Sequence, residues 1–206
     1  VFLGEYGIGT AVDLVSAMRH FEQQGATELE DAKLVRSCLD SFLADWRRWH
    51  MEEAFASPED YFRECLRKGA SQRTLGMNAV RSNPHIVGYN ITGGIDHLMT
   101  GEGQTTLFRD LKPGLVDALF DGFSPLRLCL FVAQDHFYRG QKMRFEAVLA
   151  NEDVLKPGKY SVRLQIVGPD LKRVMDKQVT FTVHQDEEVT EPAFAHVWTC
   201  GEQLEA

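Results

Sequence analysis

The first part of the chain combines two short apolar runs with longer stretches of helical periodicity. Residues 1–6 and 85–92 are apolar and end in glycine or polar loops, a pattern typical of buried strands. Between them the sequence predicts a helix over 11–24, capped by Thr10, and a helix over 28–50. Apolar residues in steps of three and four give the second helix one face for core packing: Val35, Leu39, Phe42, Trp46 and Trp49.

Two further helices are expected before the pattern changes. Ser57 can cap the first of them, and Pro58 suits the first helical position because its missing N–H needs no partner there. We expect this helix to run toward Asn83-Pro84, where proline stops it. The second is expected over about 105–120, with an irregular middle at 112–114.

From Pro125 onward the apolar and polar positions alternate. Four segments with this alternation are expected to be strands: 127–134, 142–150, 159–168 and 173–184. Turn sequences rich in Gly and Pro separate them, which predicts a β-sandwich. We therefore predict two domains, 1–124 and 125–206, and leave open whether the second is truncated. The expected core of the sandwich is Leu128, Leu130, Val148, Val162, Leu164, Ile166, Val179 and Phe181.

Strand alternation selects candidate functional side chains. Buried strands separated by helices indicate a parallel sheet, so we expect residues 1–6 and 85–92 to be adjacent parallel strands with Glu5 and Asn90 close together at their ends. In a (β/α)8 barrel, catalytic side chains lie at the carboxyl ends of the strands. Alternation places Leu3 and Glu5 on one face of the first strand, and Asn90 and Thr92 on the inward face of the second. A lone inward carboxylate is costly to bury without a partner. Glu5 is therefore either a catalytic or ligand-binding residue or a member of a structural ion pair.

Composition and charge argue against several classes of function. Hydrophobic residues make up 44% of the chain and charged residues 25%, as in a folded globular protein. The net charge of -8 argues against a nucleic-acid partner, because phosphates need a basic surface. No run of about 18 apolar residues is present, so we expect no membrane span. The four cysteines lack metal-binding spacing, so we expect inert thiols, no metal and no cofactor.

The segment Leu3-Gly4-Glu5-Tyr6-Gly7 resembles the seventh barrel strand of glycoside hydrolase family 2 enzymes, which include β-galactosidases, β-glucuronidases and β-mannosidases. Residues 85–90 resemble the eighth strand, and the β-rich part looks like the immunoglobulin-like modules of that family. The resemblance implies the last part of a (β/α)8 TIM barrel followed by an immunoglobulin-like β-sandwich. Because the chain begins in what reads as mid-strand, we expect it to be a fragment of a larger protein.

The same resemblance implies an activity. It makes Glu5 the nucleophile of a retaining glycosidase that acts on a carbohydrate substrate, and Tyr6, Asn90, Thr92 and Asp96 candidate substrate-binding residues. A retaining mechanism needs a second carboxyl group about 5 Å away. In the family this acid/base residue lies on the fourth strand, outside this chain, so the fragment is expected to be inactive by itself.

Some features favour a different class of function. The second strand carries Asn90 and Thr92 where many relatives have a tryptophan beneath the sugar, which favours this second class. The helical insertion over 25–84 is a further departure from the family, since it is longer than a typical barrel crossover. The alternative is therefore a non-catalytic carbohydrate-binding or scaffolding protein with a degenerate barrel. Asp96, His97 and Glu102 on the following loop could bind sugar hydroxyls, or could belong to a solvated loop.

Overall fold

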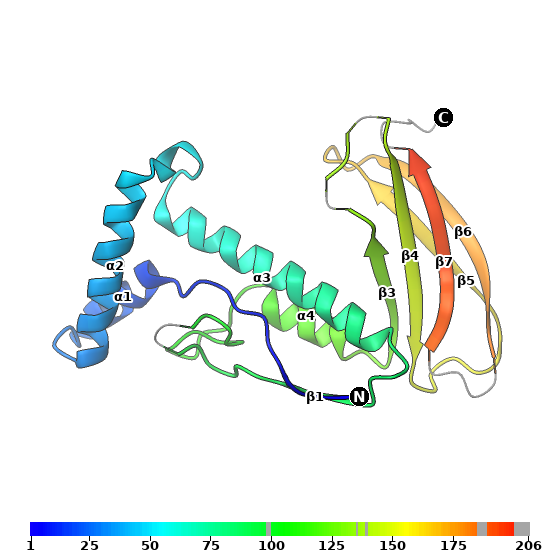
Figure 1. Ribbon diagram of the computed structural model, residues 1–206, viewed down its shortest axis with the longest axis horizontal. Coiled ribbons are helices and arrows are strands. Elements are labelled where there is room, and N and C mark those ends of the chain that lie inside the picture. The colour runs from blue at the N-terminus through cyan, green and yellow to red at the C-terminus, as the bar shows by residue number, and fades with distance from the viewer. Residues whose placement is uncertain (98–99, 135, 139, 185–188, 200–206) are drawn as a thin grey trace. The chain divides into compact units, whose positions relative to one another are not determined.

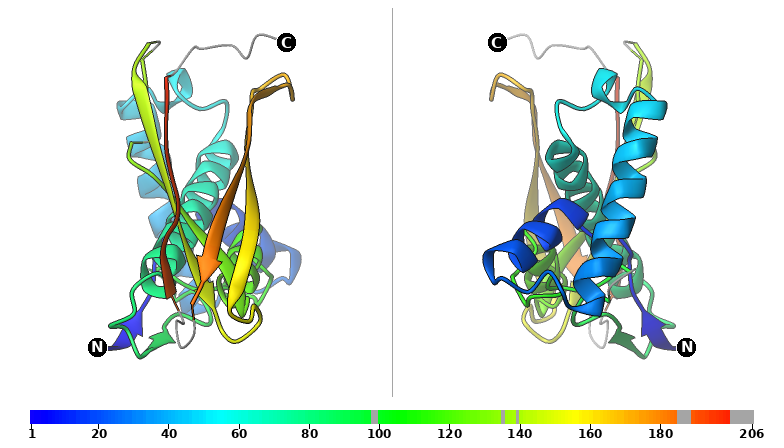
Figure 2. Two further views of the ribbon diagram at one scale, coloured as in Figure 1. Left: turned by 90° about the vertical axis from the view of Figure 1, so that its right-hand side faces the viewer. Right: turned by 90° about the vertical axis from the view of Figure 1, so that its left-hand side faces the viewer.

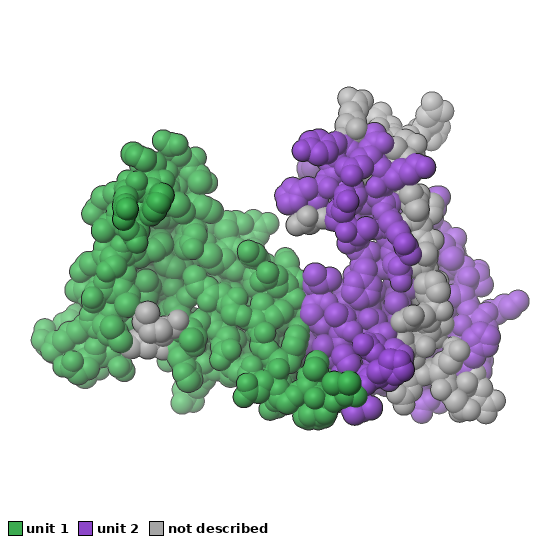
Figure 3. Space-filling view, viewed as in Figure 1, with its two compact units in different colours: residues 1–74, 88–120 green, residues 75–87, 121–206 purple. Residues whose placement is uncertain are grey.

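A computed structural model describes residues 1–97, 100–134, 136–138, 140–184 and, for the backbone alone, 189–199. The elements are β1 (Phe2–Tyr6), α1 (Leu14–Gln23), α2 (Glu30–Arg48), the 3-10 helix η1 (Met51–Glu53), α3 (Pro58–Arg81), β2 (Gly88–Ile91), α4 (Leu115–Gly122), β3 (Leu126–Val132), β4 (Lys142–Asn151), β5 (Gly158–Val167), β6 (Arg173–Val183) and β7 (Val189–Thr199). The chain divides into two compact units, Val1–Thr74 with Gly88–Phe120, and Leu75–Val87 with Asp121–Ala206 (Figure 3). Helix α3 contributes residues to both.

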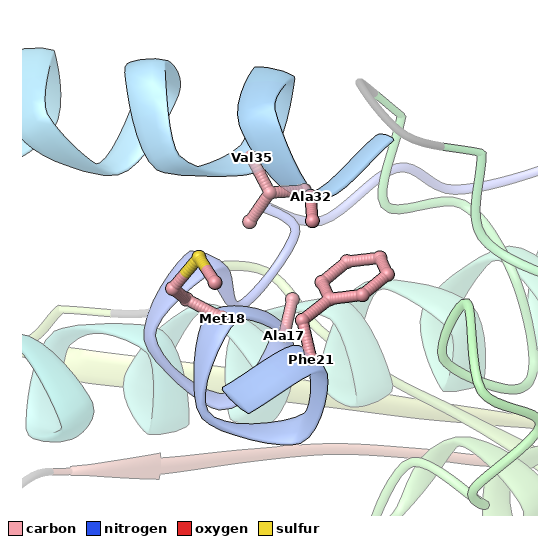
Figure 4. Close-up of a cluster of buried hydrophobic side chains, with 5 residues drawn as sticks. All are labelled: Ala17, Met18, Phe21, Ala32 and Val35. Atoms are coloured by element: carbon pink, nitrogen blue, oxygen red, sulfur yellow. The ribbon is translucent and has the colours of Figure 1, made fainter. Parts of the chain in front are cut away.

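Helices α1 and α2 of the first unit pack against each other. The Asp13 carboxylate caps α1 by accepting the Ser16 N–H at 2.9 Å, so the prediction that Thr10 caps this helix is wrong. Apolar side chains with helical spacing fill the contact between the helices. These buried side chains are Ala17, Met18, Phe21, Ala32 and Val35 (Figure 4).

The C-terminal end of α2 separates the two predicted core tryptophans. Trp46 is buried, with its ring centroid 5.8 Å from that of Phe42 and 6.3 Å from that of Tyr61. Trp49 is 66% exposed, and the Arg48 guanidinium lies 5.3 Å from its ring centroid. The core prediction is therefore confirmed for Trp46 and wrong for Trp49, because the helix ends at Arg48 and the helical period stops with it.

The start of α3 was predicted correctly from the sequence, whereas the start of α4 was not. The Ser57 hydroxyl accepts the Asp60 N–H at 3.2 Å, which confirms Ser57 as the cap of α3. The helix predicted over 105–120 is wrong in its first half, since α4 begins only at Leu115. Gly114 precedes it with a φ of 81°, a left-handed conformation that interrupts a helix and favours glycine.

Strands β1 and β2 form a two-stranded parallel sheet in the first unit (Figure 1). Leu3 pairs with Tyr89 and Tyr6 pairs with Ile91. The prediction that residues 1–6 and 85–92 contain adjacent parallel strands is confirmed. The prediction that both strands are buried is wrong for β1, in which Phe2 is 63% exposed and Gly4 and Glu5 are exposed as well. The closed (β/α)8 barrel stays a prediction.

The second unit contains two antiparallel sheets that face each other (Figure 2), with strand orders β3-β4-β7 and β5-β6. Phe145 and Ala147 of β4 pack against Val162 and Leu164 of β5 and Val179 of β6. The four strands predicted in this region are thereby confirmed, and β7, which pairs with β4, was not predicted. The assignment to the immunoglobulin-like class stays a prediction.

The predicted sandwich core is partly wrong on the first sheet. Leu128 and Leu130 of β3, one of the two edge strands of its sheet, are 39% and 41% exposed and do not belong to the cluster between the two sheets. Val148 is buried with Cys129 and Ala150, in a cluster separate from the one between the two sheets. These residues show that β3 and β4 have a second buried face.

Polar contacts join the end of α3 to β3 within the same unit. The buried Arg127 side chain donates from Nε and Nη2 to Asn78 Oδ1 at 3.1 and 2.7 Å and pairs with Asp121. Asn78 Nδ2 donates in turn to the Leu130 carbonyl at 2.8 Å. Each of the three guanidinium nitrogens of this buried arginine thus has a polar partner, as burial of a charge requires.

Cys38, Cys65 and Cys129 form no disulfide in the structure. The fourth, Cys200, lies outside the described residues. Across the described part of the chain, no helix is both long enough and apolar enough to cross a membrane.

Candidate functional site

The carboxyl end of β1 carries a bulge at the candidate nucleophile. The register shifts between Leu3 and Tyr6, so that Gly4 and Glu5 together lie opposite the single residue Asn90 on β2. The strict alternation expected for this strand therefore does not hold. Glu5 and Asn90 occupy neighbouring positions on adjacent strands, and both residues are exposed.

The Glu5 side chain makes no hydrogen bond or ion pair with any other described residue. The structural ion-pair alternative therefore finds no partner in this part of the chain. An exposed carboxylate at the end of a parallel strand is well placed to meet a ligand, because such ends form the binding face of α/β sheets.

Tyr6, the next residue, is directed to the buried side of β1. Its hydroxyl is buried without a hydrogen-bond partner among the described residues, and burial raises its pKa above the ordinary value, although the nearby Arg73 charge opposes that shift. Arg73 of α3 is 0% exposed and donates from Nη2 to the carbonyls of Ile8 at 3.4 Å and Glu102 at 3.2 Å. Burial lowers the pKa of Arg73, while Tyr6 and Glu102 oppose this. Arg73 thereby connects the loop after β1 to the loop after β2.

Thr92 follows the last residue of β2 and lies close to the loop after β1. Its N–H donates to the Tyr6 carbonyl at 3.0 Å. A Cβ added at Gly7 would lie 2.6 Å from Thr92 Oγ1 and 3.3 Å from Glu102 Oε2. Only glycine fits at this position without displacing one of them, so the Thr92 hydroxyl and the Glu102 carboxylate both approach the backbone directly after β1.

Asp96 forms a buried ion pair with Lys112. Its Oδ1 accepts the Lys112 ammonium at 2.6 Å and the Gly103 N–H at 2.9 Å, and Lys112 also donates to the Gly101 carbonyl at 2.9 Å. The Asp96 and Lys112 side chains are only 3% and 2% exposed, so the solvated-loop alternative is wrong for Asp96. His97, by contrast, is exposed.

Burial shifts the pKa values of both members of this pair toward the neutral forms. It raises the pKa of Asp96, which the hydrogen bond and charge of Lys112 oppose, and it lowers the pKa of Lys112, which Asp96 opposes. The two groups therefore depend on each other for their charge.

A cavity of about 270 Å³ opens beside this ion pair. Its lining comes from residues 11–13 and the first turns of α1, from Leu66 of α3, from residues 106–108 and 110–113, and from Asp96. Asp96 is thus the predicted site residue that reaches the cavity. Glu5, Tyr6, Asn90 and Thr92 do not line it.

Two residues of this region, Arg73 and Lys112, were not singled out as functional candidates. Arg73 lies within a long helix whose pattern predicts only a solvated charge. Lys112 precedes Pro113-Gly114, which the sequence marks as irregular but not as buried. Neither residue has a local signal for its partner, because their contacts reach 29 and 16 positions along the chain.

Within the described residues, no three His, Cys, Asp or Glu side chains gather closely enough to hold a metal ion. Neither a protein-family model nor a curated protein matches this chain.

Proposed function

We propose that this chain carries the nucleophile, Glu5, of a retaining glycoside hydrolase, with an acid/base residue supplied by another part of the protein. The observation that supports the proposal most is the position of Glu5. It is exposed at the carboxyl end of β1, beside Asn90 on the parallel neighbour β2. Catalytic side chains of (β/α)8 enzymes occupy such strand ends.

The chemistry follows from what one carboxylate can do. Ionised Glu5 attacks the anomeric carbon of the sugar and forms a glycosyl ester, while a second carboxyl group protonates the departing oxygen. That second group then removes a proton from water, which attacks the ester and releases the sugar with retained configuration. In this proposal the Asn90 amide, at the neighbouring strand position, hydrogen-bonds a sugar hydroxyl close to the reacting carbon.

The decisive experiment replaces Glu5 in the full-length protein. Glu5→Gln keeps the shape but removes the attacking charge, and we expect turnover of an aryl glycoside to fall by about three orders of magnitude or more, equivalent to roughly 4 kcal/mol. Glu5→Gly should regain turnover with added azide, giving a glycosyl azide of inverted configuration. Glu53→Gln, which changes an exposed glutamate on η1, is the matched control and should leave turnover unchanged.

Circular dichroism must show that each variant is folded before its turnover is compared. Near-normal turnover by folded Glu5→Gln would exclude the nucleophile role. Sugar binding without turnover by the unsubstituted protein would instead favour the non-catalytic alternative.

A further inference from the structure

The cavity beside the Asp96–Lys112 pair has the size of a small-ligand site. Its volume of about 270 Å³ is close to the lower limit for pockets that hold small molecules. All of its lining belongs to the first unit, and two of the lining side chains, Asp96 and Lys112, are almost completely buried. It is therefore a recess within one unit, and a buried ion pair forms part of its wall.

The charges around the recess are unbalanced. Its lining carries three aspartates, Asp13, Asp96 and Asp110, against one lysine, Lys112, which leaves a net charge of -2 when His20 is neutral. The Lys112 Nζ atom pairs with Asp96 Oδ1 at 2.6 Å, so it does not neutralise the charges of the other two carboxylates.

The carboxylates of Asp13 and Asp110 retain capacity to accept hydrogen bonds. Asp13 accepts the N–H and the hydroxyl of Ser16, one on each oxygen, which leaves a lone pair on both. Asp110 is exposed, and its carboxylate accepts no hydrogen bond from the described residues. Both groups can therefore receive N–H donors from a ligand.

Part of the remaining lining is apolar, and its aromatic ring is held by neighbouring rings. Leu66, Leu107 and Phe108 contribute to it, and the Phe108 ring stacks on His20 with 3.8 Å between centroids. Phe21 meets the same ring edge-on at 5.0 Å. Because two aromatic neighbours hold Phe108, this wall exists before any ligand binds, which reduces the entropy cost of binding.

We propose that the recess binds a small organic cation, whose ammonium group is recognised by Asp13 and Asp110 and whose compact hydrocarbon body contacts Leu66, Leu107 and Phe108. An anion is disfavoured by the same two carboxylates. The proposal does not rest on the role of Glu5, which does not line the recess. It is tested by binding rather than by turnover, so the two proposals can fail separately.

Three probes of nearly equal size separate charge from shape: cyclohexylammonium, cyclohexanol and cyclohexanecarboxylate. Each is titrated into the ¹⁵N-labelled chain at neutral pH while amide chemical shifts are recorded. We expect millimolar binding of the ammonium probe, with shifts concentrated in 13–20 and 106–112. The alcohol should bind at least fivefold more weakly, and the carboxylate should not bind.

Matched variants test which carboxylates recognise the charge. Asp13→Asn keeps the cap of α1, since asparagine caps helices about as well as aspartate, and Asp110→Asn changes an exposed side chain. The double variant should bind cyclohexylammonium about tenfold more weakly, as expected for the loss of two partly exposed ion pairs. Asp117→Asn, on the exposed side of α4 and not in the lining, should bind it unchanged.

Four results would overturn the proposal. They are equal binding of the alcohol or the carboxylate, full affinity in the folded double variant, shifts that map away from the recess, or no binding of any probe at tens of millimolar.

Discussion

Replacing Lys112 with methionine removes the positive partner of a buried carboxylate. The variant loses both hydrogen bonds of the Lys112 ammonium, one to Asp96 and one to the Gly101 carbonyl, and leaves Asp96 with the Gly103 N–H alone. Methionine nearly fills the space of the lysine stem, so packing changes little. What remains is a carboxylate that is 3% exposed and has no cation beside it.

The loss in the free energy of unfolding expected for Lys112→Met can be estimated in two ways. Removing one member of a buried pair typically costs about 3–5 kcal/mol. Asp96 can limit the cost by taking up a proton, which at pH 7 costs about 4 kcal/mol for a group of ordinary pKa near 3.9 and at pH 5 only about 1.5 kcal/mol. We therefore expect Lys112→Met to lower the free energy of unfolding by about 3–5 kcal/mol at pH 7.

The sign of the pH dependence follows from the direction of the Asp96 pKa. Burial already raises this pKa, and loss of Lys112 removes the interaction that opposes the rise. Below about pH 3.9 Asp96 is protonated in both the folded and the unfolded state, so its charge costs nothing there. As the pH rises toward the folded-state pKa, the unfolded state ionises first and stability falls. The loss caused by Lys112→Met should accordingly be smaller at pH 5 than at pH 7.

Urea unfolding at both pH values measures the loss, and hydrogen exchange at the Gly103 amide locates it. The matched control is Lys33→Met, because Lys33 lies 3.5 Å from Glu30 but is 52% exposed, and about 0.5 kcal/mol or less is expected there. Adding Asp96→Asn to Lys112→Met should recover part of the loss, since no buried charge remains. The reasoning would be refuted if Lys112→Met lowered the free energy of unfolding no more than Lys33→Met does. It would also be refuted if the double variant lost as much as Asp96→Asn and Lys112→Met lose separately, added together.

Two further predictions concern local geometry. Arg163 donates to the Asp176 carboxylate from Nε at 2.7 Å and from Nη2 at 2.6 Å, which holds the pKa of Asp176 far below its usual range. Asp176→Asn should therefore destabilise the protein at pH 7 and progressively less as the pH falls from 5 to 2, and a pH-independent difference in urea unfolding would contradict this. A Cβ at Gly101 would lie 2.1 Å from the Thr10 carbonyl oxygen, so Gly101→Ala should lower the free energy of unfolding by about 1–3 kcal/mol, measured by thermal unfolding. In the control Gly4→Ala the added Cβ has no atom within 4 Å, so no such clash is expected.

Periodic segments were predicted well because burial imposes its period on the sequence directly. The helix expected over 28–50 is α2, and the four alternating segments after Pro125 are β3 to β6. Errors occurred where an element ended or where a neighbour was missing. Trp49 continues the apolar spacing of α2 but follows its last residue, and Leu128 has the alternation of a core residue but lies on an edge strand. The sequence of each segment shows neither where the helix ends nor which strands lie beside β3.

The candidate site could be predicted only in part for a related reason. Glu5 and Asn90 were expected at neighbouring strand ends, and the parallel pairing puts them there. The bulge between Leu3 and Tyr6 was not foreseen, because it depends on the register with β2 and not on the composition of β1. The burial of Asp96 was also missed, since its partner Lys112 lies 16 positions away in a segment expected to be helical.

The loop after β2 is held by buried polar contacts whose desolvation offsets most of what they contribute to stability. A buried ion pair is commonly no more stable than apolar side chains of the same volume, so Asp96 and Lys112 are poorly explained as stabilising residues alone. Both bind the same short backbone segment at Gly101 and Gly103, and Thr10 reaches Gly101 through its N–H at 3.0 Å and its hydroxyl at 2.6 Å. These directional bonds fix one conformation of the segment, which nonpolar packing would do less specifically. Segment 101–103, held in one conformation close to Gly7 directly after β1, suits the site proposed around Glu5, because misplaced groups weaken recognition.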